Sequence, residues 1–245
     1  MKRLALITGA AQGLGRAIAE RLAQDGFELI LSDVQADAVR RTAEELRATA
    51  LPFDVSDEAA VQAAFAEIDA RFGRLDVLVN NAGVIGTGEA RFEDNALPVW
   101  LQTMAVNLNG PFLMCRGAVP LMKRGGYGRI VNMSSRAART RTAARNPAYP
   151  ASKAALIGLS RVLAGEVGGH GITVNCVAPG TVETPMTVSA HDDQADYFQR
   201  QADGTALGRI AQPGDVADAV AFLCSDEASF VTGSVIDVNA GLFMP

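Results

Sequence analysis

Short apolar runs alternate with longer amphipathic stretches along this chain. The first two runs are LALIT at 4–8 and ELILS at 28–32, and helix-like stretches follow them at 16–24 and 36–47. Apolar residues occupy both faces of these runs, which is typical of strands in a parallel sheet that helices cover on both sides. The pattern therefore predicts consecutive βαβ units.

The same alternation continues toward the carboxyl end of the sequence. A helical stretch at 57–72 leads into LDVLVN, and a long one from about 95 to 123 leads into RIVNM. Two more strands, ITVNCV and SVIDV, follow, with helices after Tyr149 and Pro213. No linker, internal repeat or low-complexity tract interrupts the pattern. These six runs and a further strand before Asp54-Val55 predict a single α/β domain over 1–245, with seven parallel strands and helices on both faces.

Two segments break this rhythm. Residues 136–147 contain four arginines, and residues 187–207 are polar and rich in Asp and Gln. Loops of this length in a compact domain are usually functional. We expect the segment at about 187–207 to be a lid over a substrate.

Composition narrows the class of protein. Hydrophobic residues make up 49% of the 245 residues and charged residues 20%, and the net charge is −5. These values describe an ordinary globular chain that buries about three quarters of its extended surface. Because there is no basic excess, we expect no nucleic-acid partner.

Cysteines, histidines and the amino-terminal run exclude further classes. Three well-separated cysteines and two histidines offer neither a disulfide framework nor metal-ligand spacing, so we expect no metal site. The apolar run at 4–7 is too short for a signal peptide, and no run approaches the roughly 18–20 residues of a membrane helix. We expect a cytoplasmic protein with no membrane partner.

A glycine-rich segment lies between the first predicted strand and a helix. Its sequence is Thr8-Gly9-Ala10-Ala11-Gln12-Gly13-Leu14-Gly15. The glycines allow the backbone to turn tightly and approach a pyrophosphate, whose charge the helix N-terminus favours. Glycine triplets also occur in ordinary turns, but a position between strand and helix favours a dinucleotide site. We expect Gly9, Gln12, Gly13, Leu14 and Gly15 to bind it.

Asp33 ends the second predicted strand, roughly 20 residues beyond the glycines. A carboxylate there accepts hydrogen bonds from the adenosine ribose hydroxyls and repels a 2′-phosphate. No lysine or arginine lies within the glycine loop to neutralise such a phosphate. Asp33 therefore predicts NAD rather than NADP, although a solvated loop acid or a helix cap is the alternative.

Tyr149 and Lys153 are four residues apart on a predicted helix, so both point to one face. A tyrosine with a pKa of about 10 is a poor base at neutral pH. A cation at about 4 Å is worth about 4 kcal/mol at an effective dielectric near 20, which would lower that pKa by about three units. An isolated pair is usually a surface pair, but the glycine loop favours a catalytic one.

The motifs and their order resemble those of the short-chain dehydrogenase/reductase family over essentially the whole chain. The remaining motifs are Asp54-Val55, Asn80-Asn81-Ala82-Gly83, Asn107, Ser135 and Pro179-Gly180. The resemblance implies a Rossmann-type, doubly wound sheet with strand order 3-2-1-4-5-6-7. It also implies a nicotinamide dinucleotide as cofactor.

The resemblance implies which residues contact the parts of that cofactor. Asp54 and Val55 would contact the adenine, and Asn81, Ala82 and Gly83 would line the central crevice. Pro179, Gly180 and Val182 would flank the nicotinamide, with Thr184 near its carboxamide.

Catalytic roles follow from the same resemblance. Ser135 would hold the substrate oxygen, Tyr149 would exchange the proton, Lys153 would also bind the nicotinamide ribose, and Asn107 would support a water-linked proton path. Ser134 is the alternative to Ser135 for this role, but alignment of the family motif to Gly128-Arg129-Ile130 favours Ser135. Family members commonly form tetramers, so we expect a homotetramer with the helices of Asn107 and Tyr149 at its interfaces.

Two features depart from the family pattern. Thirteen residues separate Ser135 from Tyr149, one more than is usual. The sequence Asp237-Val238-Asn239-Ala240-Gly241 also replaces the usual paired glycines. Both differences bear on substrate specificity and on contacts of the C-terminus.

Three functions remain open from the sequence. The first is an NAD-dependent dehydrogenase of a secondary alcohol of the polyol, sugar or hydroxy acid type. The second is a 3-oxoacyl thioester reductase, although such enzymes usually prefer NADP. The third is a dinucleotide-sensing protein without turnover.

Four arginines lie between Ser135 and Tyr149, at positions 136, 139, 141 and 145. A solvated loop or a subunit contact is the ordinary explanation of such a cluster. A loop between two catalytic residues also rims the pocket, where an arginine could bind a carboxylate, phosphate or sulfonate. We therefore hypothesise an anionic small-molecule alcohol or ketone substrate, with Arg145 as the first candidate to bind it.

Overall fold

A single parallel sheet forms the centre of the molecule, with strand order β3-β2-β1-β4-β5-β6-β7. The computed structural model describes residues 2–87, 91–140, 146–189 and 194–244. The strands are β1 (Leu4–Thr8), β2 (Glu28–Ser32), β3 (Thr49–Ala50), β4 (Val77–Asn80), β5 (Gly128–Met133), β6 (Ile172–Pro179) and β7 (Val235–Val238). The prediction of a doubly wound, seven-stranded α/β domain is confirmed.

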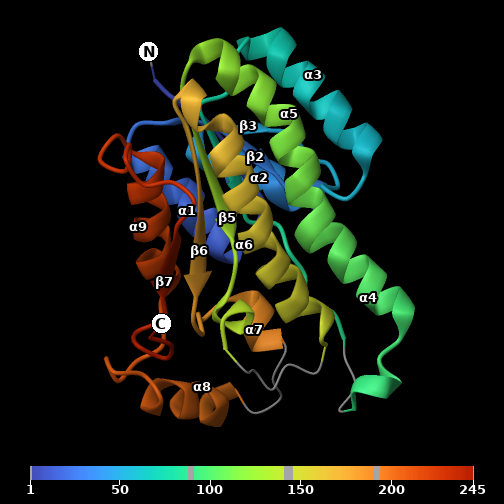
Figure 1. Ribbon diagram of the computed structural model, residues 1–245, viewed down its shortest axis with the longest axis vertical. Coiled ribbons are helices and arrows are strands. Elements are labelled where there is room, and N and C mark those ends of the chain that lie inside the picture. The colour runs from blue at the N-terminus through green and yellow to red at the C-terminus, as the bar shows by residue number, and fades with distance from the viewer. Residues whose placement is uncertain (1, 88–90, 141–145, 190–193, 245) are drawn as a thin grey trace.

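Helices cover both faces of this sheet because its strands are apolar on both faces (Figure 1). The helices in the described ranges are α1 (Gly13–Gln24), α2 (Ala36–Leu46), α3 (Glu58–Phe72), α4 (Leu97–Met104), α5 (Gly110–Gly125), α6 (Ala148–Val167), α7 (Pro185–Ser189), α8 (Gln194–Asp203) and α9 (Pro213–Cys224). None of these described helices is long and apolar enough to cross a membrane.

Side chains that alternate along β1 divide the interior into two cores. Ala5 and Ile7 pack in the core that includes residues of α1, α2 and α9. Leu4 and Leu6 pack in the other core, with residues of α3, α5 and α6. All four side chains are fully buried, so the sheet is firmly sandwiched between its helix layers.

Asn107 lies in a break within the long helical stretch. The sequence predicts one helix from about 95 to 123, but α4 and α5 are separated by a π-helical turn at Ala105–Asn109. At the start of α5, a Cβ on Gly110 would lie only 2.9 Å from Val55 Cγ2, so the helix passes very close to the loop after β3. Turns of this kind are frequent at functional sites.

The polar segment expected as a loop at 187–207 contains helical structure instead. It includes the end of α7 and all of α8. Thr181 Oγ1 donates a hydrogen bond to Gln201 Oε1 at 2.9 Å, which ties α8 to the end of β6. The backbone N–H of Ala206 donates to the carbonyl of Ala240 at 2.8 Å. These partners lie far away in sequence, where a local pattern does not reveal them.

The C-terminal turn keeps a backbone shape that usually requires glycine. Ala240 has φ +51° and Gly241 has φ +81°. A left-handed conformation costs a residue with a Cβ roughly 1–2 kcal/mol. Asn239 Oδ1 accepts hydrogen bonds from the backbone N–H groups of Gly241 and Phe243 at 3.0 and 3.4 Å, which stabilises the turn.

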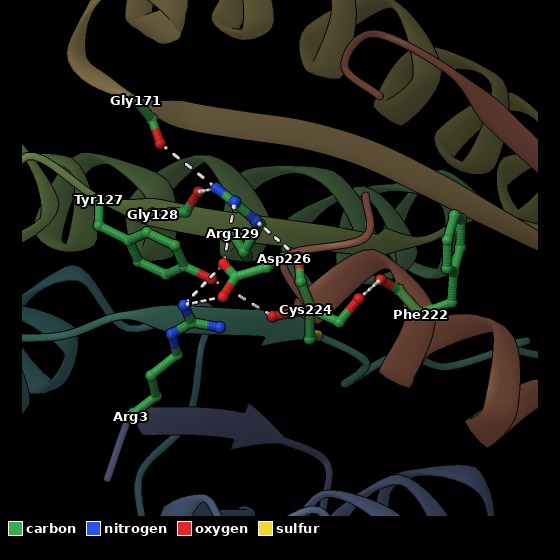
Figure 2. A network of polar contacts seen from close by, with 9 residues as sticks. Arg3, Tyr127, Gly128, Arg129, Gly171, Phe222, Cys224 and Asp226 are labelled. Carbon is green, nitrogen blue, oxygen red and sulfur yellow. Dashed lines mark hydrogen bonds and ion pairs between the residues drawn. The ribbon is translucent and has the colours of Figure 1, made fainter. Parts of the chain in front are cut away.

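Polar and aromatic side chains join three segments at the amino ends of the strands (Figure 2). Arg3 Nη2 donates to both carboxylate oxygens of Asp226 at 2.6 and 2.7 Å. The guanidinium carbons of Arg3 and Arg129 lie 4.3 and 4.2 Å from the centre of the Tyr127 ring. Arg129 is 4% exposed and donates to three backbone carbonyls, those of Gly128, Gly171 and Ser225. This amino-end cluster anchors β1, β5 and the loop after α9.

Candidate active site

A cleft of about 500 Å³ opens at the carboxyl ends of the strands. Ligands of such sheets bind at this edge, where the strand order reverses, and here the reversal falls between β1 and β4. Every residue predicted to contact the cofactor lines the cleft: Gly9, Gln12, Gly13, Leu14, Gly15, Asp33, Asp54, Val55, Asn81, Ala82, Gly83, Tyr149, Lys153, Pro179, Gly180, Val182 and Thr184. Ser135 lines it as well, whereas Asn107 is fully buried and does not.

The three glycines of the loop after β1 serve different geometric needs. A Cβ on Gly15 would collide with the carbonyl oxygen of Gly9, and a Cβ on Gly9 would lie 2.8 Å from Ala82 Cα. Gly13 has φ +57°, and a Cβ there would lie 3.7 Å from its nearest neighbours, Thr184 and Pro185. Gly9 and Gly15 therefore allow close packing, and Gly9 and Gly13, with φ +64° and +57°, provide the left-handed turns of the loop up to the start of α1.

Thr8 and Asn81 hold the glycine loop against the end of β4. Thr8 Oγ1 accepts hydrogen bonds from the backbone N–H groups of Asn81 and Ala82 at 3.1 and 3.0 Å. Asn81 Nδ2 donates to the carbonyls of Thr8 and Gly9 at 2.9 and 3.0 Å. Sequence reasoning assigned no role to Thr8, because its partners lie more than seventy positions away.

Asp33 is half-buried at the end of β2. Its Oδ2 accepts a hydrogen bond from the backbone N–H of Ala11 at 3.1 Å, and its Oδ1 accepts one from Gln35 at 3.0 Å. These bonds fix the carboxylate at the wall of the cleft beside the glycine loop. Among the described residues that line the cleft there is no arginine, and the single lysine is Lys153.

Asp54 and Val55 form the cleft wall after β3. Asp54 Oδ1 accepts hydrogen bonds from the backbone N–H and the hydroxyl of Ser56 at 2.8 and 2.7 Å. Val55 is 6% exposed and presents an apolar surface. An apolar wall with a polar rim suits a flat heteroaromatic ring.

The opposite wall follows β6. A Cβ on Gly180 would lie 3.0 Å from Asn239 Cα, so the C-terminal turn backs this wall. Val182 forms a β-bridge with Ala211. Thr184 Oγ1 and Thr187 Oγ1 share a hydrogen bond of 2.7 Å. The residues predicted to contact the nicotinamide are thus held in place by residues outside β6, namely Asn239, Ala211 and Thr187.

Ser135 and Tyr149 meet inside the cleft. Both side chains line the cleft, and the Ser135 hydroxyl acts to lower the pKa of the Tyr149 phenol. Ser134 points elsewhere: its hydroxyl is buried and donates to the carbonyl of Lys153 at 2.9 Å. Of the two neighbouring serines, Ser135 is therefore the one that acts on the phenol.

Lys153 lies deep in the same cleft. It is 5% exposed, and its Nζ donates to the carbonyl of Met133 at 2.7 Å. The distance from Nζ to the centre of the Tyr149 ring is 5.9 Å. Because burial disfavours the charged form, the pKa of Lys153 falls to about 8, against a smaller raising effect of Cys176.

The electrostatics of Tyr149 differ from the sequence expectation. Burial raises the pKa of its phenol above the ordinary value, and the hydrogen bond from Ser135 acts in the opposite direction. The raised pKa differs in direction from the expectation that Lys153 could nearly suffice to lower it by about three units, with the charge of the oxidised nicotinamide adding to its effect. Desolvation of the phenolate is the largest cause, and Lys153 Nζ lies 5.9 Å from the ring centre rather than at about 4 Å.

Asn107 braces the cleft from behind. Its Oδ1 accepts a hydrogen bond from the backbone N–H of Val84, and its Nδ2 donates to the carbonyl of Val84, both at 2.8 Å. Nδ2 also donates to Ser152 Oγ at 3.2 Å, and Ser152 Oγ donates to the carbonyl of Tyr149 at 2.7 Å. The amide therefore connects the loop after β4 to α6.

The arginine-rich loop is described only in part. Arg139 Nη1 lies 3.4 Å from Asp237 Oδ2, and its guanidinium carbon lies 4.8 Å from the centre of the Phe243 ring. Neither Arg136 nor Arg139 lines the cleft. Arg141 and Arg145, the first candidate for an anionic group, lie outside the described residues.

The residues present fit a nicotinamide dinucleotide. The N-terminus of α1 opens toward the cleft, and no side chain caps it, so its N–H groups suit a pyrophosphate. Asp33 suits a ribose, and Val55 suits an adenine. Within the described ranges, no three His, Cys, Asp or Glu side chains are grouped to hold a metal ion.

Comparison with known proteins agrees with this site. Residues 9–243 match the family model described as Enoyl-(Acyl carrier protein) reductase. The chain is 40% identical to D-threitol dehydrogenase from Mycolicibacterium smegmatis, over 98% of this chain and 92% of that one. It is 38% identical to the 3-oxoacyl-[acyl-carrier-protein] reductase FabG of Escherichia coli, over 99% and 98% of the two chains.

A solved structure shows the same architecture. A candidate gluconate dehydrogenase from Agrobacterium tumefaciens superimposes with a TM-score of 0.93 at 31% identity, over 98% of this chain and 95% of that one. Fold and site thus define an oxidoreductase with a Rossmann-type sheet. The chain belongs to the short-chain dehydrogenase/reductase family, which uses a nicotinamide dinucleotide as cofactor.

Proposed function

We propose that this protein interconverts a secondary alcohol and its ketone with NAD, using Tyr149 as the acid and base. The observation that carries the proposal is that Ser135, Tyr149 and Lys153 line one cleft, where the Ser135 hydroxyl acts on the Tyr149 phenol. A serine hydroxyl beside a phenol can hold a substrate oxygen while the phenol exchanges its proton.

The chain's own residues divide the work of the reaction. When bound, the nicotinamide ring accepts or returns the hydride, and its oxidised form adds a positive charge near the phenol. In oxidation, Ser135 holds the substrate oxygen and Tyr149 removes its proton; in reduction, Tyr149 returns that proton. Lys153 binds the nicotinamide ribose and stabilises the phenolate. Asn107 positions Tyr149 and Lys153 through its hydrogen bond to Ser152 in the same helix, and it supports the proton path.

We propose NAD as the preferred cofactor because of Asp33. The carboxylate is held in place by Ala11 and Gln35, at the wall where an adenosine ribose would lie. Ribose hydroxyls can donate to it, whereas a 2′-phosphate would meet a like charge. No basic side chain among the described cleft residues near Asp33 offsets that repulsion.

The substrate class follows from the site and from the relatives. The similarity to D-threitol dehydrogenase and to a candidate gluconate dehydrogenase supports a polyol, sugar or hydroxy acid. The alternative is reduction of a 3-oxoacyl thioester, which the 38% identity to FabG supports. Both reactions use the same proton and hydride transfers, so the group attached to the carbinol carbon distinguishes them.

Two surrounding segments complete the proposed substrate site. Residues 187–207 act as a lid; Thr187, at its start, and the preceding residue Met186 line the cleft. The loop of Arg136, Arg139, Arg141 and Arg145 binds an anionic group of the substrate. Because Arg139 is engaged with Asp237 and Arg136 does not line the cleft, Arg145 remains the first candidate.

We further propose that the protein is a cytoplasmic homotetramer. Large apolar side chains remain exposed on α4, α5 and α6, where Leu97, Leu101, Phe112 and Val162 are 65, 56, 47 and 73% exposed. Such surfaces on neighbouring helices suit subunit contacts. The three buried, unpaired cysteines support a reducing compartment. Light scattering with size-exclusion chromatography tests the assembly, and a monomeric mass would contradict it.

A substrate screen tests the proposed function. Secondary alcohols, polyols and hydroxy acids are offered with NAD and with NADP at alkaline pH, and the absorbance of the reduced cofactor is followed. Each hydroxy acid is paired with its neutral amide, and a 3-oxoacyl thioester is offered with each reduced cofactor. We expect NAD-dependent oxidation that favours a charged substrate. Turnover of the thioester alone supports the alternative, and tight NADH binding with no turnover supports a sensor.

A further inference from the structure

Asn146 joins three segments around the cleft through its side-chain amide. It lies three residues before Tyr149 and is 4% exposed. Its Nδ2 donates to the carbonyl of Ile85 at 2.7 Å and to Thr103 Oγ1 at 3.1 Å. Its Oδ1 accepts the backbone N–H of Ala148 at 3.0 Å. Both polar atoms of the Asn146 side chain are therefore hydrogen-bonded, and their partners lie in three different segments.

Each of these segments carries a residue of the candidate site. Ile85 follows Gly83 in the loop after β4, and Thr103 lies in α4, just before the π-helical turn of Asn107. Ala148 is the first residue of α6, and Tyr149 is the second. Asn146 thus lies where the cofactor wall, the Asn107 turn and the proton donor meet.

The backbone of the loop after β4 is shaped around this amide. Gly86 has φ +72°, and a Cβ there would collide with Asn146 Nδ2 and lie 2.9 Å from Thr103 Oγ1. Asn107 bonds both backbone groups of Val84, while Asn146 bonds the carbonyl of Ile85. Two asparagines therefore hold consecutive residues of one loop, and each also bonds into the first turns of α6.

We propose that Asn146 is a positioning residue that holds the Tyr149 hydroxyl beside Ser135. The first N–H groups of a helix have no partner within the helix, so its first turn moves easily unless it is capped. Asn146 supplies such a cap at Ala148 and fastens it to the Ile85 loop and to α4. This inference rests on the proposed function of Tyr149, which touches the substrate; Asn146 acts only through it.

The expected consequence of losing Asn146 is a fall in turnover rather than in cofactor binding. A displacement of about 1 Å at a reacting group costs up to about 100-fold in rate. We therefore expect Asn146→Asp and Asn146→Ala to lower kcat about 10- to 100-fold, with the Kd for NADH changed by less than about threefold. The hydrogen bond from Ser135 lowers the pKa of Tyr149, so a displaced phenol should titrate at higher pH.

Asn175 offers a matched control. It is fully buried in β6, its Nδ2 donates to the carbonyl of Val231 at 2.7 Å, and its Oδ1 accepts the backbone N–H of Ser234 at 3.1 Å. Asn175→Asp makes the same chemical change in another buried, hydrogen-bonded asparagine, which does not line the cleft. A general loss of stability would lower the Tm of both variants, but only Asn146→Asp should lower kcat.

Thr103→Val provides a milder second variant if the Asn146 variants fold poorly. It removes only the hydroxyl that accepts from Asn146 Nδ2, and we expect a smaller fall in kcat in the same direction. The ultraviolet titration of phenolate is measured in each protein, with Tyr149→Phe in the same background to isolate the Tyr149 signal. This readout does not depend on knowing the substrate.

The outcomes separate this inference from the proposed function. A higher Tyr149 pKa and a lower kcat in Asn146→Asp, with Asn175→Asp unchanged in both, support the inference. An unchanged Tyr149 titration in Asn146→Asp and Thr103→Val overturns it. If the wild-type protein oxidises no alcohol, the proposed function fails, but the titration still decides whether Asn146 positions the phenol.

Discussion

Single carboxylates and hydroxyls set the chemistry of this cleft, and Asp33 shows how. Its two oxygens accept backbone N–H groups from the glycine loop and from Gln35, so the charge has a fixed place at the cleft wall. A fixed charge discriminates between ligands better than a mobile one, because the repelled phosphate cannot push it aside. We therefore expect this residue to set the choice of cofactor.

Asp33→Asn should weaken the preference for NAD. The substitution keeps a hydrogen-bond acceptor and removes the charge, so NADP no longer meets a repelling carboxylate. We expect the wild-type protein to favour NAD by more than about tenfold in kcat/KM, and the variant to lose most of that ratio. Steady-state kinetics with both cofactors measure it, with the exposed Asp37→Asn as a control. A wild-type protein that uses NADP equally well contradicts the assignment.

The sequence revealed some of these residues and concealed others. Gly9, Gly13, Gly15 and Tyr149 stand in short motifs whose spacing carries the chemistry, so they could be assigned without a structure. Thr8 and Asn146 form bonds to partners 43 to 74 positions away, and no local pattern contains such contacts. The pKa of Tyr149 could not be predicted either, because its burial depends on the whole cleft.

At the scale of elements, helix ends carry much of the local stability. The start of α9 has a capping box: Asp215 Oδ2 accepts the backbone N–H of Gln212 at 2.8 Å. Arg209 donates to both oxygens of Asp215 at 2.7 and 2.9 Å. These bonds lower the pKa of Asp215 to about 2, with the Arg209 hydrogen bond as the largest cause.

Asp215→Asn should therefore destabilise the protein in a pH-dependent way. A lowered pKa in the folded state means that the carboxylate stabilises the fold above its ordinary pKa of 3.8, and that this contribution is lost as the pH falls toward 2. We expect a loss of about 0.5–1 kcal/mol at pH 7, as for other caps, that shrinks between pH 4 and pH 2. Urea unfolding at several pH values tests it. An equal deficit at pH 7 and pH 3 would contradict the role of the charge.

The elements themselves were largely readable from periodicity, with two informative exceptions. Residues 95–123 keep a helical pattern throughout, so nothing in it marks the π-helical turn at Ala105–Asn109. That turn coincides with the close approach of Gly110 to Val55, a tertiary contact. Likewise α7 and α8 lie in a segment that is polar locally, and α8 is fastened to the distant Thr181.

At the scale of the whole molecule, the two ends of the sheet have separate tasks. The carboxyl ends of the strands form the cleft, while the amino ends carry the cluster of Arg3, Tyr127, Arg129 and Asp226 (Figure 2). Arg129 is buried and bonded to three carbonyls, so it fastens segments that are distant in sequence. We therefore expect substitutions at the two ends of the sheet to change stability and chemistry separately.

Arg129→Met should lower stability without changing the cleft. Buried carbonyls lose a charged donor, at a cost of about 2–4 kcal/mol, or roughly 5–15 °C in Tm for a chain of this size. Arg116→Met is the matched control, because Arg116 pairs with Glu58 on the surface and should matter little. Thermal unfolding and NADH titration measure both. A weaker NADH affinity of Arg129→Met, or equal Tm changes in the two variants, would contradict the separation of stability from chemistry at the two ends of the sheet.

The central claim, that Tyr149 transfers the proton, is tested most directly by Tyr149→Phe. The substitution keeps the ring and removes only the hydroxyl, so folding and NADH binding should be preserved. We predict a fall in kcat of about 100-fold or more, with the Kd for NADH unchanged within about twofold. Tyr127→Phe, at the opposite end of the sheet, should leave kcat unaltered. A Tyr149→Phe protein that retains a tenth or more of the wild-type kcat would contradict the account.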